Sequence, residues 1–166
     1  MSKADPRLAA IGDVDEANSA IGIALLHADG AAKAMLARIQ NELFDLGADL
    51  ATPGEDFAPG ETTLRIVAEQ IDRLEREIDK MNEDLAPLKS FILPGGGAAA
   101  AYLHLARSIT RRAERSAVAA ARSVSLNPLA LTYINRLSDH LFVMARWTAR
   151  EEGGDVLWQP GATRGA

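Results

Sequence analysis

Four arginines and one glutamate lie within nine consecutive residues of the chain: Arg107, Arg111, Arg112, Glu114 and Arg115. On an α-helix, Arg107, Arg111 and Arg115 recur every four residues, so they share one face with Glu114 beside them. Three like charges on one face repel one another unless negative groups lie opposite, and guanidinium groups bind carboxylates and phosphates through paired hydrogen bonds. Two sources of negative charge are therefore possible. Either carboxylates of the protein neutralise this face, or the phosphates of a ligand neutralise it.

The segment that precedes this face is FILPGGG, residues 91–97. Backbone N–H groups at a helix N-terminus bind anions, and glycines let an anion approach closely. A glycine triplet is also an ordinary loop, and this one matches neither the P-loop nor the dinucleotide fingerprint. Phe91 is either an anchor in the core or a wedge at the rim of a site, and general burial tendencies favour the anchor.

Polar side chains that could pair with the arginines occur on two other expected helices. They are Asp13, Asp15 and Asn18 near the N-terminus, and Asn135, Ser138 and Asp139 near the C-terminus. In the structural interpretation, Asp15 and Asp139 neutralise the arginines across the bundle or across a subunit interface. In the functional interpretation, one or two arginines stay free for a polyphosphate. A carboxylate cluster on a helix is also often only a solvated face.

The elements that must position these groups are all helical. Apolar residues recur every three or four positions, which predicts helices over residues 7–29, 31–50, 64–80, 97–124 and 128–151. A threonine at 62 or 63 is the expected N-cap of the third helix, and Asn127 followed by Pro128 that of the fifth. Five helices with short connections predict an all-α, up-and-down bundle of the ferritin-like kind. Residues 153–166, with Trp158, are expected to dock as an extended tail.

Composition narrows the class of protein. The 166 residues predict a single domain, and the net charge of −5 argues against a nucleic-acid binder. No apolar run is long enough to span a bilayer, and the N-terminus has no signal-peptide pattern, so we expect no membrane partner and a cytoplasmic location. The chain has no cysteine, and its three histidines are too dispersed to predict a metal site. It also lacks a nucleophile elbow and an HExxH motif.

Six strings resemble the PduO-type ATP:cob(I)alamin adenosyltransferases, in order and with similar spacing. They are AIGDVDEANSAIG (10–22), FDLGADLATP (44–53), FILPGG (91–96), ARSITRRAER (106–115), NRLSDHLFVMAR (135–146) and DVLWQPG (155–161). The resemblance covers the chain from about Lys3 to Gly161. It implies a five-helix bundle that forms a homotrimer, with active sites between subunits.

The resemblance also implies a reaction. The 5′-deoxyadenosyl group of ATP is transferred to the cobalt of cob(I)alamin, and triphosphate is released. Cobalt(I) is the nucleophile, so no nucleophilic side chain is needed. ATP and cobalamin are then the substrates, and Mg²⁺ accompanies the triphosphate. A reductase and an adenosylcobalamin-dependent enzyme are the implied partners.

Site residues follow from the resemblance by position. Phe91 matches the residue at the lower face of the corrin, and Asp15 and Arg107 match a pair that joins across the subunit interface. The positions that match residues around ATP are Lys3, Arg111, Glu114 and Asn135. Structural roles are expected for Arg112, Arg115 and Asp139.

One departure concerns the N-terminus. Members of the family usually begin with a Thr/Gly/Asp-rich segment that wraps the ATP phosphates, and this sequence starts just after the place where that segment is expected. If the protein lacks the segment, ATP binding is expected to be weak. A non-catalytic corrinoid-binding or regulatory trimer is then the alternative to the enzyme.

Overall fold

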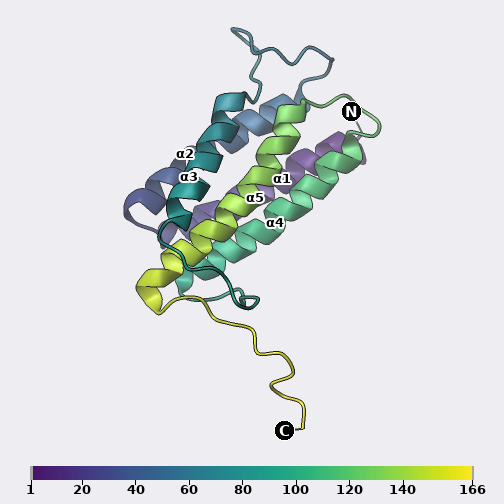
Figure 1. Ribbon diagram of the computed structural model, residues 1–166. Helices are drawn as coiled ribbons and strands as arrows, with labels where there is room; N and C mark the ends of the chain where they lie inside the picture. The colour runs from purple at the N-terminus through teal and green to yellow at the C-terminus, as the bar shows by residue number, and fades with distance from the viewer. Residues whose placement is uncertain (1, 166) are drawn as a thin grey trace.

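The computed structural model describes residues 2–165, and the described chain is a bundle of five α-helices (Figure 1). They are α1 (Pro6–Leu26), α2 (Gly30–Ala51), α3 (Ala68–Asn82), α4 (Ala98–Ala120) and α5 (Pro128–Ala149), followed by a 3₁₀ turn, η1 (Arg150–Glu152). The predicted all-α, five-helix fold is confirmed. Within residues 2–165, no helix is both long and apolar enough to cross a membrane.

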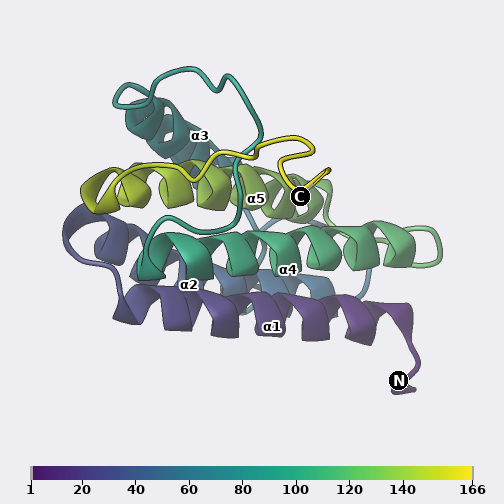
Figure 2. The same ribbon diagram turned by 90° about the horizontal axis from the view of Figure 1, so that it is seen from below.

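The helices pack in a chain of neighbours. α1 packs on α4 and α2, while α5 packs on α4 and α3. Figure 2 shows α1, α4 and α5 lying side by side along the length of the bundle. Both α1 and α4 carry fully buried alanines, such as Ala10 and Ala17 on α1 and Ala106 and Ala113 on α4. Short side chains let these two helices approach closely, so groups on their edges are held in a fixed register.

The N-terminus of α5 forms as predicted. The side chain of Asn127 accepts a hydrogen bond from the backbone N–H of Leu129 at 3.0 Å, and Pro128 occupies the first helical position. The predicted threonine cap of the third helix is wrong. That helix begins at Ala68 with Val67 as its N-cap, and the preceding residues run without helical structure.

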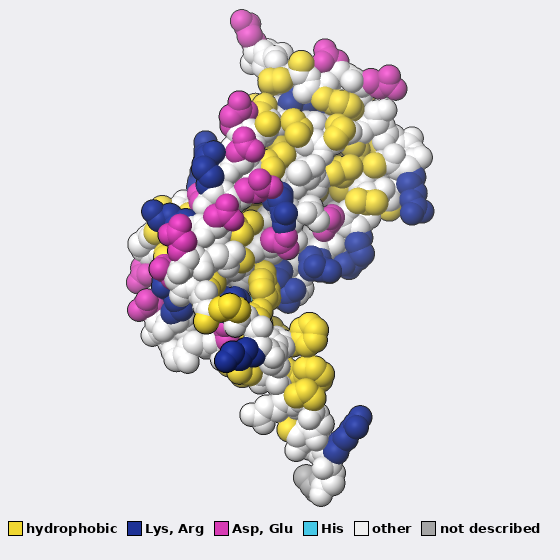
Figure 3. All heavy atoms as spheres, in the orientation of Figure 1, with side chains coloured by type: hydrophobic (Ala, Val, Ile, Leu, Met, Phe, Trp, Pro, Cys, Tyr) yellow, Lys and Arg dark blue, Asp and Glu magenta, His cyan; other side chains and the backbone are white. Residues whose placement is uncertain are grey.

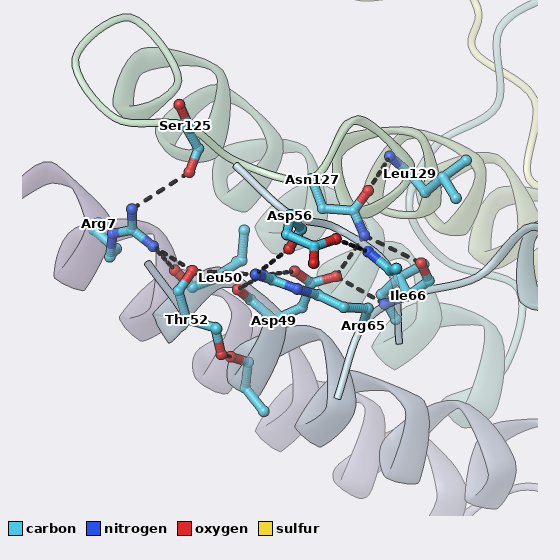
Figure 4. A network of polar contacts seen from close by, with 12 residues as sticks. Arg7, Asp49, Leu50, Thr52, Asp56, Arg65, Ile66, Ser125, Asn127 and Leu129 are labelled. Atoms are coloured by element: carbon cyan, nitrogen blue, oxygen red, sulfur yellow. Dashed lines mark hydrogen bonds and ion pairs between the residues drawn. The ribbon is translucent and has the colours of Figure 1, made fainter. Parts of the chain in front are cut away.

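A buried polar network explains why α3 starts late. The carboxylate of Asp49, which is 1% exposed, accepts hydrogen bonds from Arg65 Nη1 at 2.8 Å and from the N–H of Ile66 at 2.7 Å. Asn127 Nδ2 donates to the same carboxylate at 2.7 Å, and Arg7 donates to the carbonyl of Leu50 nearby (Figure 4). An N–H that donates to Asp49 belongs to a segment held extended, so the helix cannot begin there.

A second network ties α2, α3 and α5 together. Glu42 is buried and accepts a hydrogen bond from the hydroxyl of Tyr133 at 2.7 Å, and it forms an ion pair with Arg38. Arg38 also pairs with Glu77, which receives a hydrogen bond from the buried ring of His140 at 2.7 Å. Burial opposes the charged form of Glu77, but these hydrogen bonds outweigh it and lower its pKa from 4.5 to about 2.

The C-terminal tail runs beside the connection between α3 and α4. An isolated antiparallel bridge joins Ile92 to Leu157. The N–H of Leu93 donates to the carbonyl of Val156 at 2.7 Å, and the N–H of Trp158 donates to the carbonyl of Phe91 at 2.8 Å. Beyond this pairing the tail extends away from the bundle (Figure 1).

Candidate functional site

A cavity of about 590 Å³ opens where α4, α5, the connection before α4 and the tail meet. Its lining includes Phe91, Arg107, Phe142 and Trp158. Figure 3 shows dark blue Lys and Arg side chains gathered along the edge where α4 lies, and yellow hydrophobic atoms that continue onto the tail. An apolar wall beside a guanidinium suits a ligand that is both flat and anionic or polar.

Phe91 lies at the rim of this cavity. Its side chain is 76% exposed, so the expectation from burial tendencies that it anchors the core is wrong. The backbone hydrogen bond from Trp158 holds it in place, and the two rings lie 5.9 Å apart between centroids at 59°. An exposed aromatic pair of this kind offers its ring faces to a ligand.

Arg107 lines the same cavity and has no partner of opposite charge in the described part of the chain. Its guanidinium lies 5.8 Å from the ring centroid of Phe142, and its Nε is buried without a hydrogen-bond partner among residues 2–165. Burial lowers the pKa of Arg107 below its usual range, and the like charge of Arg111 lowers it further. An unpaired, half-buried cation is costly, so this position favours an anion from outside the chain.

His104 lies one helical turn before Arg107 on α4, next to the cavity. It is 3% exposed and meets Phe142 edge-on, with 6.2 Å between ring centroids. Burial lowers the pKa of His104, Arg107 lowers it further and Asp155 opposes the change, so the imidazole is held neutral. The neutral ring acts as packing beneath Phe142.

The seam between α4 and α5 continues along both helices from this cavity. Arg107 meets Phe142, and seven residues farther along α4, Glu114 accepts a hydrogen bond from Asn135 Nδ2 at 2.8 Å. The two helices are therefore antiparallel, and the two contacts lie about 10 Å apart along α4. Arg111 is exposed between them. The seam thus combines a free cation with an amide–carboxylate pair.

Other predicted residues are engaged within the chain. Arg112 donates to Asp13 at 3.2 Å and to Glu16, so it joins α4 to α1. The carboxylates that it meets are therefore not Asp15 or Asp139, which the structural interpretation named. Arg115 donates to the carbonyl of Arg111 in its own helix. Within one chain, Asp139 pairs with Arg136 on α5 and not with an arginine of α4, so it does not neutralise that face across the bundle. Neutralisation across a subunit interface stays a prediction.

The glycine run does not form an open anion site. Gly97 has φ of 109°, and a Cβ built on it would overlap the carboxylate of Glu152. A Cβ built on Gly96 would lie 3.1 Å from the Cβ of Ala149 and 3.1 Å from the carbonyl oxygen of Gly154, which is a tight contact. The glycines therefore make room for the end of α5 and η1, and a carboxylate already lies at the start of α4, where it would repel phosphate.

Asp15 and Lys3 lie elsewhere. Asp15 is exposed on α1 and lines a different cavity, of about 490 Å³, formed with α2 and bordered by Asn18 and the 74%-exposed Phe44. Lys3 is exposed before α1, at the end of the bundle where Arg7 reaches Ser125, far along α4 from Phe91. Within one chain, the structure does not bring either residue to Arg107.

Sequence reasoning missed Phe142 and His104 as residues of this cavity, and it missed the ion pair of Arg146 with Asp155. The position of Phe142 could have been predicted from the sequence, because it follows Asn135 by seven residues and so lies on the same side of α5. Among residues 2–165, no group of three or more His, Cys, Asp or Glu side chains is arranged to hold a metal ion.

These features define a class: a helical bundle with an aromatic cavity that continues into a basic interhelical seam. Residues 1–148 match the family model described as cobalamin adenosyltransferase. The chain belongs to this family.

Curated relatives and a solved structure agree. A corrinoid adenosyltransferase of Mycobacterium tuberculosis is 49% identical over 170 residues, covering 100% of this chain and 86% of that protein. One from Bacillus subtilis is 42% identical over 164 residues, covering 94% and 81%. A variant of the PduO-type ATP:corrinoid adenosyltransferase from Lactobacillus reuteri, complexed with cobalamin and ATP, superposes with a TM-score of 0.87. That structure is 40% identical, and the match covers 96% of this chain and 89% of that one.

Proposed function

We propose that this protein transfers the 5′-deoxyadenosyl group of ATP to the cobalt of cob(I)alamin. The observation that carries the proposal is the shared cavity of Phe91 and Arg107, which opens onto the seam holding Arg111 and the Glu114–Asn135 pair. An aromatic rim suits the flat face of a corrin, and the adjoining seam suits ATP. The relatives named above carry the same activity in their names.

The reaction needs alignment and charge stabilisation from the protein. The electron pair of cobalt(I) forms a bond to C5′ of ATP while the C5′–O bond breaks, and the triphosphate leaves with that bonding pair. We assign Arg111 to the triphosphate and Glu114 and Asn135 to ATP, with Lys3 as a further phosphate contact. Phe91 is assigned to the lower face of the corrin. A positioned guanidinium stabilises the charge that develops on the leaving group.

Mg²⁺ is proposed to accompany the triphosphate. Magnesium usually keeps several waters and binds through one or two carboxylates plus substrate phosphates. Glu114 is the acidic member of the proposed ATP residues, and one of its oxygens is already bonded to Asn135. The donor set therefore suits an ion held mainly by the phosphates.

A homotrimer with sites between subunits is proposed as the assembly. Arg107 has no carboxylate partner within residues 2–165, and Asp15 is exposed beside an apolar cavity with the exposed Phe44. A second copy that places Asp15 against Arg107 satisfies both groups and covers the apolar surface. Sedimentation should give three times the 17.7 kDa of one chain. Asp15→Ala and Arg107→Ala should each weaken assembly and activity, and the charge-swapped pair Asp15→Arg with Arg107→Asp should restore assembly.

The test of the activity is direct. The protein is mixed with ATP, Mg²⁺ and chemically reduced cobalamin, and formation of the Co–C bond is followed by absorbance. The assay is run on the chain alone and on a version preceded by the Thr/Gly/Asp-rich segment of the family. Turnover in either form supports the enzyme. Cobalamin binding without turnover in both forms overturns it in favour of a non-catalytic corrinoid-binding protein.

A further inference from the structure

One side chain on α5 holds both segments that wall the aromatic cavity. Arg146 Nε donates to Asp155 Oδ2 at 3.0 Å, and Arg146 Nη2 donates to the carbonyl of Ala86 at 2.8 Å. Asp155 begins the part of the tail that carries Trp158, and Ala86 lies in the connection that carries Phe91. A single planar guanidinium therefore bridges the tail and the connection, which are about 70 residues apart in sequence.

Few other contacts join these two segments. Their mutual pairing rests on two backbone hydrogen bonds, from Leu93 to Val156 and from Trp158 to Phe91, and on one from Ser90 Oγ to the carbonyl of Trp158 at 3.1 Å. The apolar side chains along the tail are largely outside the core, with Val156 44% exposed and Trp158 45% exposed. By contrast, the side chains of Arg146 and Asp155 are only 10% and 18% exposed. A shielded charge pair contributes more to holding such a segment than exposed apolar contacts do.

We infer that Arg146 is a positioning residue for the corrinoid: it clamps the connection and the tail onto α5 and so sets the gap between the rings of Phe91 and Trp158. Arg146 does not line the cavity, so it acts through the segments it holds. The identity of the ligand rests on the proposed function, whereas the clamp itself does not. A lysine at this position keeps the charge but lacks the fork that reaches two acceptors at once.

The clamp is tested first without any ligand, by amide hydrogen exchange of the assembled protein. The reporters are the N–H groups of Leu93 and Trp158, which donate the two hydrogen bonds between the segments. In Arg146→Ala, which removes both hydrogen bonds, we expect both amides to exchange at least tenfold faster, since about tenfold is the loss expected for a single charge-assisted hydrogen bond. Asp155→Asn removes the charge of the tail contact and so weakens only that contact, and it should accelerate Trp158 more than Leu93. Amides in the middle of α1 report that the bundle remains folded.

The matched control is Arg150→Ala. Arg150 also pairs with a carboxylate, Asp84, and its guanidinium lies 4.8 Å from the ring centroid of Trp147, but it makes no contact with residues 155–158. It should leave both reporter amides unchanged. If Arg146→Ala and Asp155→Asn also leave them unchanged, or if Arg150→Ala accelerates them equally, the clamp is overturned.

The second readout is kinetic and concerns cobalamin. Arg146→Ala should raise the KM for cob(I)alamin about tenfold while the KM for ATP stays within twofold, and Arg146→Lys should lie between this variant and the parent protein. Faster exchange with an unchanged KM for cobalamin would show a clamp that does not position the substrate, and would overturn the inference. If the parent protein shows no turnover, the proposed function fails, and the exchange experiment still decides whether the clamp exists.

Discussion

The polar groups near the two ends of α5 are organised in opposite ways. At the N-terminal end, both oxygens of Asp49 accept hydrogen bonds from within the chain, and the carboxylate is almost fully buried. Toward the C-terminal end, Arg107 is half-buried with a free Nε and faces aromatic rings. The first arrangement stabilises the fold, because the carboxylate of Asp49 has a local ion-pair partner in Arg65. In the second, the guanidinium of Arg107 has no negative partner among residues 2–165, and a ligand or a neighbouring subunit can supply that negative charge.

The largest effect is expected from breaking the closed network. Asp49→Ala leaves Arg65 buried without its carboxylate partner and the N–H of Ile66 buried without its acceptor, so the free energy of unfolding should fall by about 3–5 kcal/mol. Urea denaturation followed by circular dichroism measures this change. The control is Asp139→Ala, which removes an exposed pair with Arg136 and should cost less than about 1 kcal/mol. Equal losses in the two variants would contradict the distinction between closed and open regions.

The next largest effect is expected at the seam between α4 and α5. It should lower the rate of the reaction and leave the free energy of unfolding almost unchanged. Arg111→Ala should lower kcat/KM by roughly 10²–10³-fold, because a positioned donor to the leaving group is lost. Its free energy of unfolding should stay within about 0.5 kcal/mol, since the side chain is exposed. Arg115→Ala is the matched control, because Arg115 contacts only the backbone of its own helix. A comparable loss of activity in the control would remove Arg111 from its proposed role.

This contrast also explains what the sequence could reveal. The five helices follow from apolar spacing, and the N-cap at Asn127 follows from local chemistry. The start of α3 could not be predicted in this way. Asp49 accepts a hydrogen bond from the backbone of a residue 17 positions away, and no local sequence pattern indicates that contact. The arginine face was visible as a cluster, but spacing alone did not separate Arg112, which Asp13 neutralises, from Arg107, which has no such partner. Which arginine is free depends on the register of α1 against α4.

A smaller effect is expected from pH acting on the second closed network. Because the pKa of Glu77 is lowered from 4.5 to about 2, its ionised form stabilises the folded chain. This contribution is fully present above about pH 4.5 and is lost as pH falls toward 2. It should amount to about 2 kcal/mol after solvent screening. Denaturation across this range measures it, and Glu77→Gln should flatten that part of the pH dependence. A variant with the same acid sensitivity as the parent would show that other carboxylates dominate.

The smallest effect is expected at the rim of the open cavity. Phe91→Ala removes a ring that is 76% exposed, so stability should change by less than about 0.5 kcal/mol and ATP binding should be unchanged. Adenosylation of cobalamin should slow by about tenfold or more, because the ring is proposed to cover the lower face of the corrin, where the axial ligand must be displaced. A corrinoid that lacks this lower ligand needs no displacement and should be affected less. Steady-state rates with the two substrates measure the difference. Equal losses on both would mean that Phe91 shapes the cavity without acting on the lower ligand, while a large loss of stability would return it to the role of a core anchor.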